Sequence, residues 1–395
     1  MYITIIIHPK KWGGRKINKV LLKKQIGTTL VVVLLILLIA QIAPKLTQKY
    51  KKDSIFNQEF VLGTVVDVLE DNTEEDPFVE NRYRGYQKFT VQIEEGSQKD
   101  NQFTITHTLS SVRSAYAYEG LKAVFTVRTD SKGKTIVWLY NYRREYGVYF
   151  LILLLVTVVL LIGKREGLNS LLALAFTATV LIFIVVPGMW TPHPILIAII
   201  SSIVICGVSY LLIAGMSKKA LIASLGTLFG ITLAGLLSYT MGKVLNLSGV
   251  DMEKGEALLY LAQDKGFKIK DLLFVSILFS SLGATMDIAI SIASSSEQLL
   301  IANPNVEKKA LFKSLMAVGK DIIGTMTNTL ILAFCGASLP LAMMIWGYDM
   351  SYKQFINIPI IVINILQAFC GSIGMVSSVL FTAVCAILLN FRRKK

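Results

Sequence analysis

The chain has 395 residues, of which 53% are hydrophobic and only 17% are charged. Soluble domains carry about 25% charged residues, so this composition, with its long apolar runs, excludes an ordinary water-soluble globular protein. The formal charge of +14 would suit a nucleic-acid partner. The basic residues, however, lie in short segments at the ends of apolar runs, as orientation charges do in membrane proteins, and we predict no nucleic-acid binding.

The first predicted elements are a basic cytoplasmic N-terminus, residues 1–25, and a transmembrane helix, residues 26–43. The N-terminus holds seven Lys or Arg. It is long for a secretory signal, and no clear small-x-small cleavage site follows the apolar run. We therefore predict an uncleaved first span with its N-terminus in the cytoplasm.

Residues 44–146 regain charge and alternate polar with apolar residues, which predicts an extracytoplasmic β-rich domain. Five short strands of this kind indicate a small barrel or sandwich, and an OB-like barrel is one option. The acidic segment Asp71–Glu80 contains Pro77 and is predicted to be a mobile loop. The predicted strands are Phe60–Glu70, Tyr86–Glu95, Gln102–Leu109, Leu121–Thr129 and Lys134–Tyr140.

Residues 147–391 are predicted to form a seven-helix transmembrane domain, followed by a basic cytoplasmic tail, residues 392–395. Most of the seven runs approach the roughly 20 residues that a 30 Å hydrocarbon core requires. The fold class is thus a membrane all-α helical bundle of about eight transmembrane helices with an inserted small all-β domain. The seven runs are Tyr149–Ile162, Leu168–Val186, His193–Ala214, Leu221–Met241, Leu272–Ala293, Ile322–Leu341 and Gly371–Leu389.

Two further segments are ambiguous. Phe355–Phe369 is apolar but contains Pro359, so it is an interfacial or re-entrant helix, or else a ninth span. A ninth span would place the basic tail outside, and we favour eight spans with both termini cytoplasmic. Val306–Gly319 is amphipathic and is predicted to lie along the inner membrane surface.

The most informative polar residue is Asp287, which lies inside an apolar run. An Asp at the centre of a membrane helix costs about 2.5–3.5 kcal/mol, so such residues face the bundle interior or a wet cavity. Helical spacing places Gly283 and Ser291 on the face of Asp287. Ser281 is a predicted hydrogen-bonding partner. Each of these small residues also suits plain helix packing.

The next run carries Asp321, Thr325 and Asn328 at i, i+4 and i+7, so these three share a helix face. Two adjacent antiparallel helices would bring Asp287 and Asn328 to the same depth. We predict one polar site, with Asp287 as a proton or cation acceptor. The alternatives are helix packing for Thr325 and N-terminal capping for Asp321.

Several kinds of chemistry have no signature in the chain. The sequence holds no P-loop, no HExxH and no GxSxG motif, and its three histidines are far apart. We predict that the protein is not an enzyme, binds no metal and needs no cofactor. The glycines Gly226 and Gly230 form a GxxxG pattern, whose usual role is close helix packing.

At these segments the sequence resembles the YibE/F family of bacterial multi-span membrane proteins. The resemblance covers about residues 145–390 and is carried by three stretches. It implies a transporter or permease in the bacterial cell membrane, acting on a small molecule or ion, with membrane lipids and a second YibE/F-like subunit as partners. The alternative function is a non-transporting membrane scaffold or sensor whose outer domain binds a partner. The stretches are Leu282–Ala293, Asp321–Leu332 with Gly336–Pro340, and Gly371–Met375.

Overall fold

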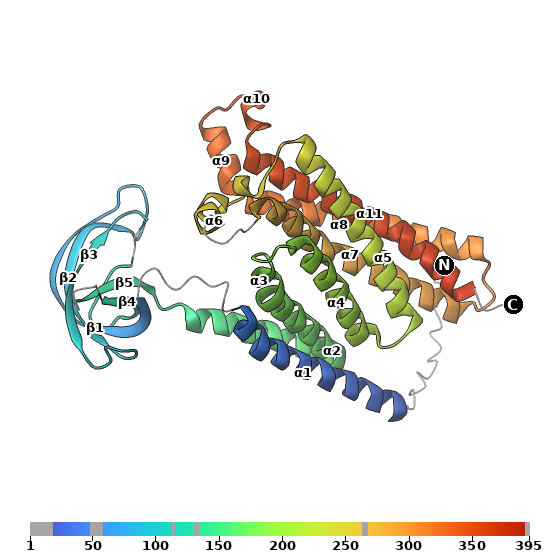
Figure 1. The fold of residues 1–395 in the computed structure, drawn as a ribbon, viewed down its shortest axis with the longest axis horizontal. Coiled ribbons are helices and arrows are strands. Elements are labelled where there is room, and N and C mark those ends of the chain that lie inside the picture. Colours follow the sequence, from blue (N-terminus) through green and yellow to red (C-terminus); the bar gives the residue numbers. More distant parts are fainter. Residues whose placement is uncertain (1–18, 48–57, 113–114, 130–133, 263–267, 392–395) are drawn as a thin grey trace, which may run out of the picture. The chain divides into compact units, whose positions relative to one another are not determined.

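The computed structural model describes residues 19–47, 58–112, 115–129, 134–262 and 268–391. The chain divides into two compact units: Met1–Tyr50 joined with Leu160–Lys395, and Lys51–Val159. The first unit is helical and the second contains a β-sheet (Figure 1). Most of the predicted N-terminus and the basic tail fall outside the described residues.

The β unit is a five-stranded antiparallel sheet in the order β3-β2-β1-β4-β5. Alternating apolar side chains form its core, with Phe89, Val91 and Phe125 almost inaccessible. β1 pairs with β4 through its first half and with β2 through its second half, and two register shifts bend it between the partners. β3 and β5 also contact each other, so the sheet curls. The strands are β1 (Gln58–Glu75), β2 (Tyr83–Ile93), β3 (Gln102–Leu109), β4 (Lys122–Thr129) and β5 (Thr135–Tyr142).

The prediction that Asp71–Glu80 forms a mobile loop is wrong for the first half of the segment. β1 continues to Glu75, because Asp71 and its successors pair with β2. Asp76 then anchors the chain: its carboxylate accepts from the hydroxyl of Ser111 and from Arg84 Nε at 2.7 Å. The acidic composition of this segment concealed a paired strand.

The helical unit contains the long apolar helix α1 and the part of α2 from Leu160 onward, while the first part of α2 belongs to the other unit. α2 contains a residue with non-helical backbone angles, Lys164, at φ 47° and ψ −119°. α2 therefore consists of two helical segments that meet at a kink at Lys164. The helices are α1 (Lys19–Thr47), α2 (Glu145–Val180), α3 (Val186–Gly188), α4 (Pro194–Ala214), α5 (Lys218–Val244), α6 (Gly255–Ala262), α7 (Ile269–Ala302), α8 (Lys308–Ala337), α9 (Leu339–Gly347), α10 (Tyr352–Phe355) and α11 (Pro359–Phe391), with a π-helical turn at Leu181–Val185 and a 3₁₀ turn at Gly249–Asp251.

Helices α5, α7 and α11 pack pairwise against one another at the centre of the helical unit, and α4 covers α5 and α7. The small residues of α5 allow this close approach. A Cβ on Gly226 would lie 1.9 Å from Thr382 Oγ1, and one on Gly230 would lie 2.7 Å from the carbonyl oxygen of Gly374. The packing role predicted for the GxxxG pattern is confirmed.

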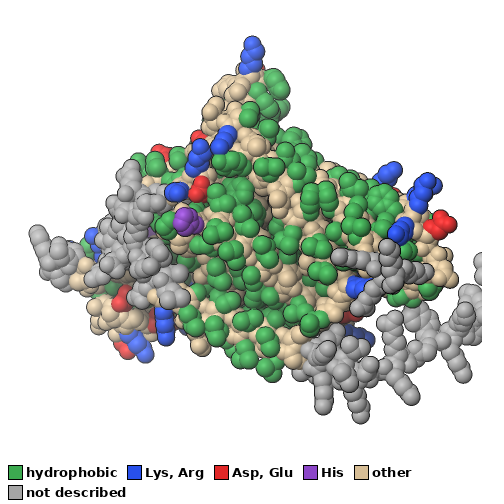
Figure 2. All heavy atoms as spheres, turned by 45° about the vertical axis from the view of Figure 1, so that its right-hand side comes forward, with side chains coloured by type: hydrophobic (Ala, Val, Ile, Leu, Met, Phe, Trp, Pro, Cys, Tyr) green, Lys and Arg blue, Asp and Glu red, His purple; other side chains and the backbone are tan. Residues whose placement is uncertain are grey.

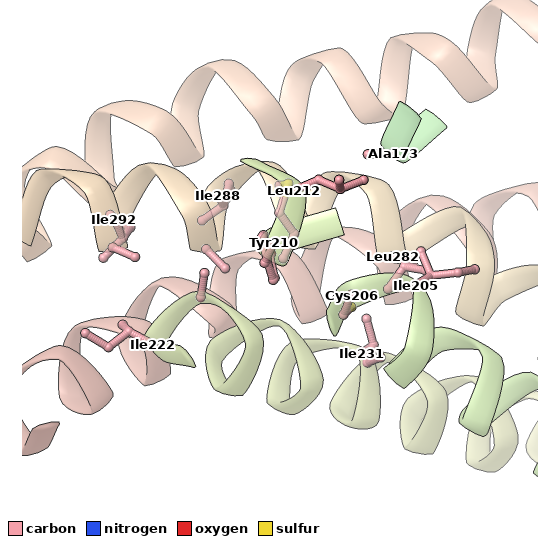
Figure 3. Packing of buried hydrophobic residues seen from close by; sticks show 14 of the residues in the cluster. Ala173, Ile205, Cys206, Tyr210, Leu212, Ile222, Ile231, Leu282, Ile288 and Ile292 are labelled. Atoms are coloured by element: carbon pink, nitrogen blue, oxygen red, sulfur yellow. The ribbon is translucent and has the colours of Figure 1, made fainter. Parts of the chain in front are cut away.

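The apolar core between these helices is built mainly from branched side chains. Figure 3 shows Ile231 of α5 and Leu282 and Ile288 of α7 in the same cluster as Tyr210 of α4. Ile288 is fully buried. The outer surface is also largely hydrophobic over the face drawn in Figure 2, as expected for helices in contact with lipid.

Two of the predicted helix assignments are wrong. Val306–Gly319 is not a separate surface helix, because α8 runs unbroken from Lys308 and buries Leu311 and Leu315 in the bundle. Phe355–Phe369 forms neither a separate interfacial or re-entrant helix nor a ninth span. Pro359 is the first residue of α11, where its missing N–H costs nothing, and the helix continues from there to the chain's last described residues.

Candidate functional site

The residues predicted on α7 fall into an exposed group and a buried one. Asp287 and Gly283 lie on an exposed face, and nothing lies within 4 Å of a Cβ built on Gly283. Ser291 is half-buried, and its hydroxyl donates to the backbone carbonyl of Asp287 at 2.7 Å. Ser281 is fully buried and donates to the carbonyl of Leu278 at 3.0 Å. Ser281 therefore packs inside the bundle, away from the open face.

The carboxylate of Asp287 is open to its surroundings. Within the part of the chain that the structure describes, it makes no hydrogen bond and no ion pair. A membrane-embedded carboxylate in this position needs water or another polar group beside it, because lipid offers neither. The side chain is not sealed in a dry contact between helices.

The residues predicted on α8 are also exposed. Asp321, Thr325 and Asn328 all lie on accessible surface, and the hydroxyl of Thr325 donates to the carbonyl of Ile322 at 3.0 Å. None of residues 320–347, which run from the middle of α8 through α9, is buried. This half of α8 therefore contributes little to the core of the described bundle.

Contacts at two glycines set the register of α7 against α8. Ile292 of α7 approaches Gly319 of α8, with its Cδ1 3.5 Å from a Cβ built on that glycine. Leu330 of α8 and Ser281 of α7 both approach Gly371 of α11, at 3.3 and 3.7 Å from its built Cβ. Along α7 the contact at Ser281 comes before the one at Ile292, whereas along α8 the order of the two contacts is reversed, so α7 and α8 run antiparallel. The two contacts are 11 residues apart on each helix, which fixes the register.

This register places Asp287 level with Gly324, next to Thr325. Asp321 and Asn328 lie three residues before and four residues after Gly324, or about 5–6 Å along the helix axis. The carboxylate and the α8 side chains thus lie within about one helical turn of the same level. We call the exposed residues, together with the half-buried Ser291, the polar face; it consists of Gly283, Asp287, Ser291, Asp321, Thr325 and Asn328.

The structure adds a residue that the sequence reasoning missed. Tyr210 of α4 is 1% exposed, and its hydroxyl shares a 2.5 Å hydrogen bond with the hydroxyl of Thr227 on α5. The same hydroxyl donates to the carbonyl of Met286, directly before Asp287. An aromatic residue inside an apolar run gives no periodic signal. The only available hint was its position among the serines of α4.

No metal centre is visible in the described ranges, where no group of three or more His, Cys, Asp or Glu side chains lies close enough to hold an ion. The side chains of the polar face are two carboxylates, two hydroxyls and one amide. These groups can accept and release protons or replace water around a cation.

Among the described residues, six helices are long and apolar enough to cross a membrane, and α8 with α9, bent by 61°, makes a seventh if the pair is one span. Such helices, with an ionisable residue inside one of them, define a multi-pass membrane protein. Residues 151–392 match the family described as YibE/F-like protein, and the chain belongs to this family, which confirms the predicted resemblance. No curated protein and no solved structure matches the chain.

Proposed function

We propose that the protein is a secondary transporter of a small molecule or ion, and that the polar face is part of the translocation path. The observation that carries this proposal is the exposed carboxylate of Asp287 on an apolar helix, level with polar groups of α8 and without a partner among the residues that the structure describes. Intramembrane carboxylates of this kind mark ion pathways and proton relays in transporters. The absence of a P-loop from the sequence supports transport driven by an ion gradient rather than by ATP.

In this proposal Asp287 binds the coupling proton or cation. Asn328 and Thr325 supply hydrogen bonds to the transported species, and Asp321 provides a second negative charge about one turn away. A Cβ built on Gly283, one turn before Asp287, would meet no atom of the described residues within 4 Å, so the helix face that both residues share is open there. The protein performs no covalent chemistry and is not an enzyme under this proposal.

The test is Asp287→Asn in a strain that lacks the chromosomal copy, with metabolite and ion levels compared between strains. We expect the variant to insert into the membrane in normal amount and to reproduce the profile of the deletion strain. Asp349→Asn is the matched control, because Asp349 lies in an exposed turn at φ 49°, a conformation that Asn tolerates. A fully active Asp287→Asn protein would refute the proposed site.

The second candidate function is a membrane scaffold or sensor that transports nothing. It is favoured by the β unit, which has its own hydrophobic core and therefore the character of a separate binding domain. Deletion of residues 50–140 separates the two functions. A scaffold loses all activity on this deletion, whereas a transporter keeps its flux and loses at most its regulation.

For the topology, we propose eight spans in a bacterial cell membrane, with both termini in the cytoplasm. The break at Lys164 supports this number, because Glu145–Gly188 is 44 residues long and, as one straight helix, would measure about 66 Å, twice the hydrocarbon thickness. We further propose that the β unit is extracytoplasmic and OB-like. The contact between β3 and β5, the two edge strands of the curled sheet, supports a barrel.

For partners, we propose membrane lipids and a second YibE/F-like subunit that covers part of the polar face. Support comes from residues 320–347, which bury no side chain within the chain itself. Polar and small residues on membrane helices commonly contact other helices, because lipid does not satisfy their hydrogen bonds.

A further inference from the structure

A cavity of about 200 Å³ lies where α4 and α7 begin and α5 ends. α6 contacts α7 and helps to locate the cavity end of the helical unit in Figure 1. The cavity is distinct from the polar face: Lys270 at its rim is about 25 Å along α7 from Asp287. Its volume corresponds to about seven water molecules at about 30 Å³ each. Its polar lining comprises Ser238, Tyr239, Lys243, Lys270 and Asp271.

Ser238 is the most unusual residue of this lining. It is 2% exposed, and its hydroxyl has no hydrogen-bond partner in the described part of the chain. Thr240, two residues later on the same helix, shows the ordinary arrangement, since its hydroxyl donates to the carbonyl of Leu236 at 2.9 Å. A buried hydroxyl without a partner destabilises the fold, and an acceptor atom in the cavity would offset this cost.

Two lysines from different helices give the cavity its charge. Lys243 lies in the last turn of α5, where a cation is favoured, and its Nζ is 4.1 Å from the centroid of the Tyr239 ring. Lys270 lies in the first turn of α7, where the helix dipole disfavours a cation, so capping does not explain it. With the carboxylate of Asp271, the lining carries one net positive charge.

Under the proposed topology this end of the bundle faces outward, so the two lysines are not orientation charges either. Lysines near a membrane surface also extend toward water without any ligand. That behaviour does not account for Ser238, whose buried hydroxyl lines the same cavity and finds no acceptor among the described residues.

We propose that this cavity binds a singly charged phosphate group, either of a free solute or of a lipid headgroup. The two ammonium groups supply point charges of the kind that bind phosphate, and the Ser238 hydroxyl donates to a phosphate oxygen. One net positive charge in the lining matches a monoanion. The inference does not depend on the transport role of Asp287.

The test uses the full-length protein in lipid nanodiscs and measures its melting temperature. In one arm, inorganic phosphate is added at pH 6 to nanodiscs of phosphatidylcholine. In the other arm, phosphatidylglycerol replaces part of the phosphatidylcholine, and native mass spectrometry counts the phosphatidylglycerol molecules that the protein retains.

Two cavity variants are compared with the wild type: Ser238→Ala, and a double variant that combines Lys243→Gln with Lys270→Gln. The controls are Thr240→Ala and Lys353→Gln, which alter an exposed hydroxyl and an exposed lysine outside the cavity.

We expect the ligand to raise the melting temperature in one arm. Either cavity variant should lower the apparent affinity for that ligand about tenfold or more, and both controls should leave it unchanged. Stabilisation by inorganic phosphate identifies a solute site, and stabilisation by phosphatidylglycerol alone identifies a headgroup site. No stabilisation in either arm, or equal stabilisation of the cavity variants, overturns the proposal. Asp287→Asn should bind as the wild type does, so failure here and failure of the transport proposal are distinguishable.

Discussion

The hydroxyl of Tyr210 on α4 donates a 3.0 Å hydrogen bond to the backbone carbonyl of Met286 on α7, the residue directly before Asp287. A serine or threonine on the same helix can satisfy such a carbonyl, but here the donor comes from a different helix. Because Tyr210 also bonds to Thr227, three helices are joined at the level of the carboxylate.

Tyr210→Phe should therefore reduce both stability and activity. We expect the free energy of unfolding to fall by about 0.6–1.5 kcal/mol, the range for one buried hydrogen bond in a membrane or soluble protein. Thermal unfolding in detergent measures the loss of stability, and the profile of the complemented deletion strain measures activity. Tyr352→Phe is the control, because Tyr352 is 73% exposed. Equal behaviour of the two variants would contradict the joining role of Tyr210.

Gly230→Ala should disrupt the centre of the bundle. The added methyl group would lie 2.6 Å from Thr285 Cγ2 and 2.7 Å from the carbonyl oxygen of Gly374, and backbone cannot move aside cheaply. We expect a loss of about 1–3 kcal/mol or more, measured as a lower melting temperature and lower yield. Gly207→Ala on α4 meets nothing within 4 Å and should be neutral. A stable Gly230→Ala protein would show that α5 and α11 are not in close contact.

The β unit should lose stability as the pH falls from about 4 to about 2. Hydrogen bonds from the Ser111 hydroxyl and the Phe78 N–H, together with Arg84, lower the pKa of Asp76 from 3.8 to about 2, against the opposite effect of burial. A depressed pKa in the folded state means that the carboxylate stabilises the fold above pH 4 and that protonation removes this contribution.

Hydrogen exchange in β1 and β2, corrected for intrinsic rates, measures this effect. Asp76→Asn should show faster exchange at neutral pH and a smaller change between pH 4 and pH 2. Asp100→Asn is the control, because Asp100 lies in an exposed turn at φ 66° and Asn accepts that conformation. A wild-type acid response in Asp76→Asn would assign the pH dependence to other carboxylates.

Cysteine labelling tests whether α2 crosses the membrane once or returns at Lys164. In a background without native cysteines, an impermeant maleimide should reach Lys164→Cys from the cytoplasm and His193→Cys from outside. Both positions are exposed in the structure. Labelling of the two cysteines from the same side would show that the chain does not cross the membrane between residues 164 and 193, and would exclude eight spans. The cysteines to be replaced are Cys206, Cys335, Cys370 and Cys385.

The sequence predicted the membrane class and the β-rich segment, because long apolar runs and period-two alternation have few other uses. β3 (Gln102–Leu109) has the predicted bounds. The sequence could not distinguish a surface helix from the packed first half of a long helix. In α8, Lys308, Lys309 and Lys313 are exposed while Leu311 and Leu315 are buried. A helix on the membrane surface would show the same pattern, with lysines on one face and leucines on the other.

For the site, helical spacing predicted that Gly283 and Asp287 share one face of their helix, and both are exposed in the structure. It could not predict the partner helix of each face. Ser281 lies six residues before Asp287, or about 240° around the helix, and this angle turns it into the core beside Gly371. The contact of Tyr210 with α7 depends on tertiary packing alone.

The unburied stretch formed by residues 320–347 has a mechanical consequence. The frame of the helical unit consists of α5, α7 and α11, while the end of α8 and α9 form an arm held to α11 by a hydrogen bond from Asn364 to Ser338 at 2.8 Å. The 61° bend between α8 and α9 lies at that same serine. Because the arm shares few buried contacts with the frame, it can change its angle at little energetic cost while the frame keeps its packing.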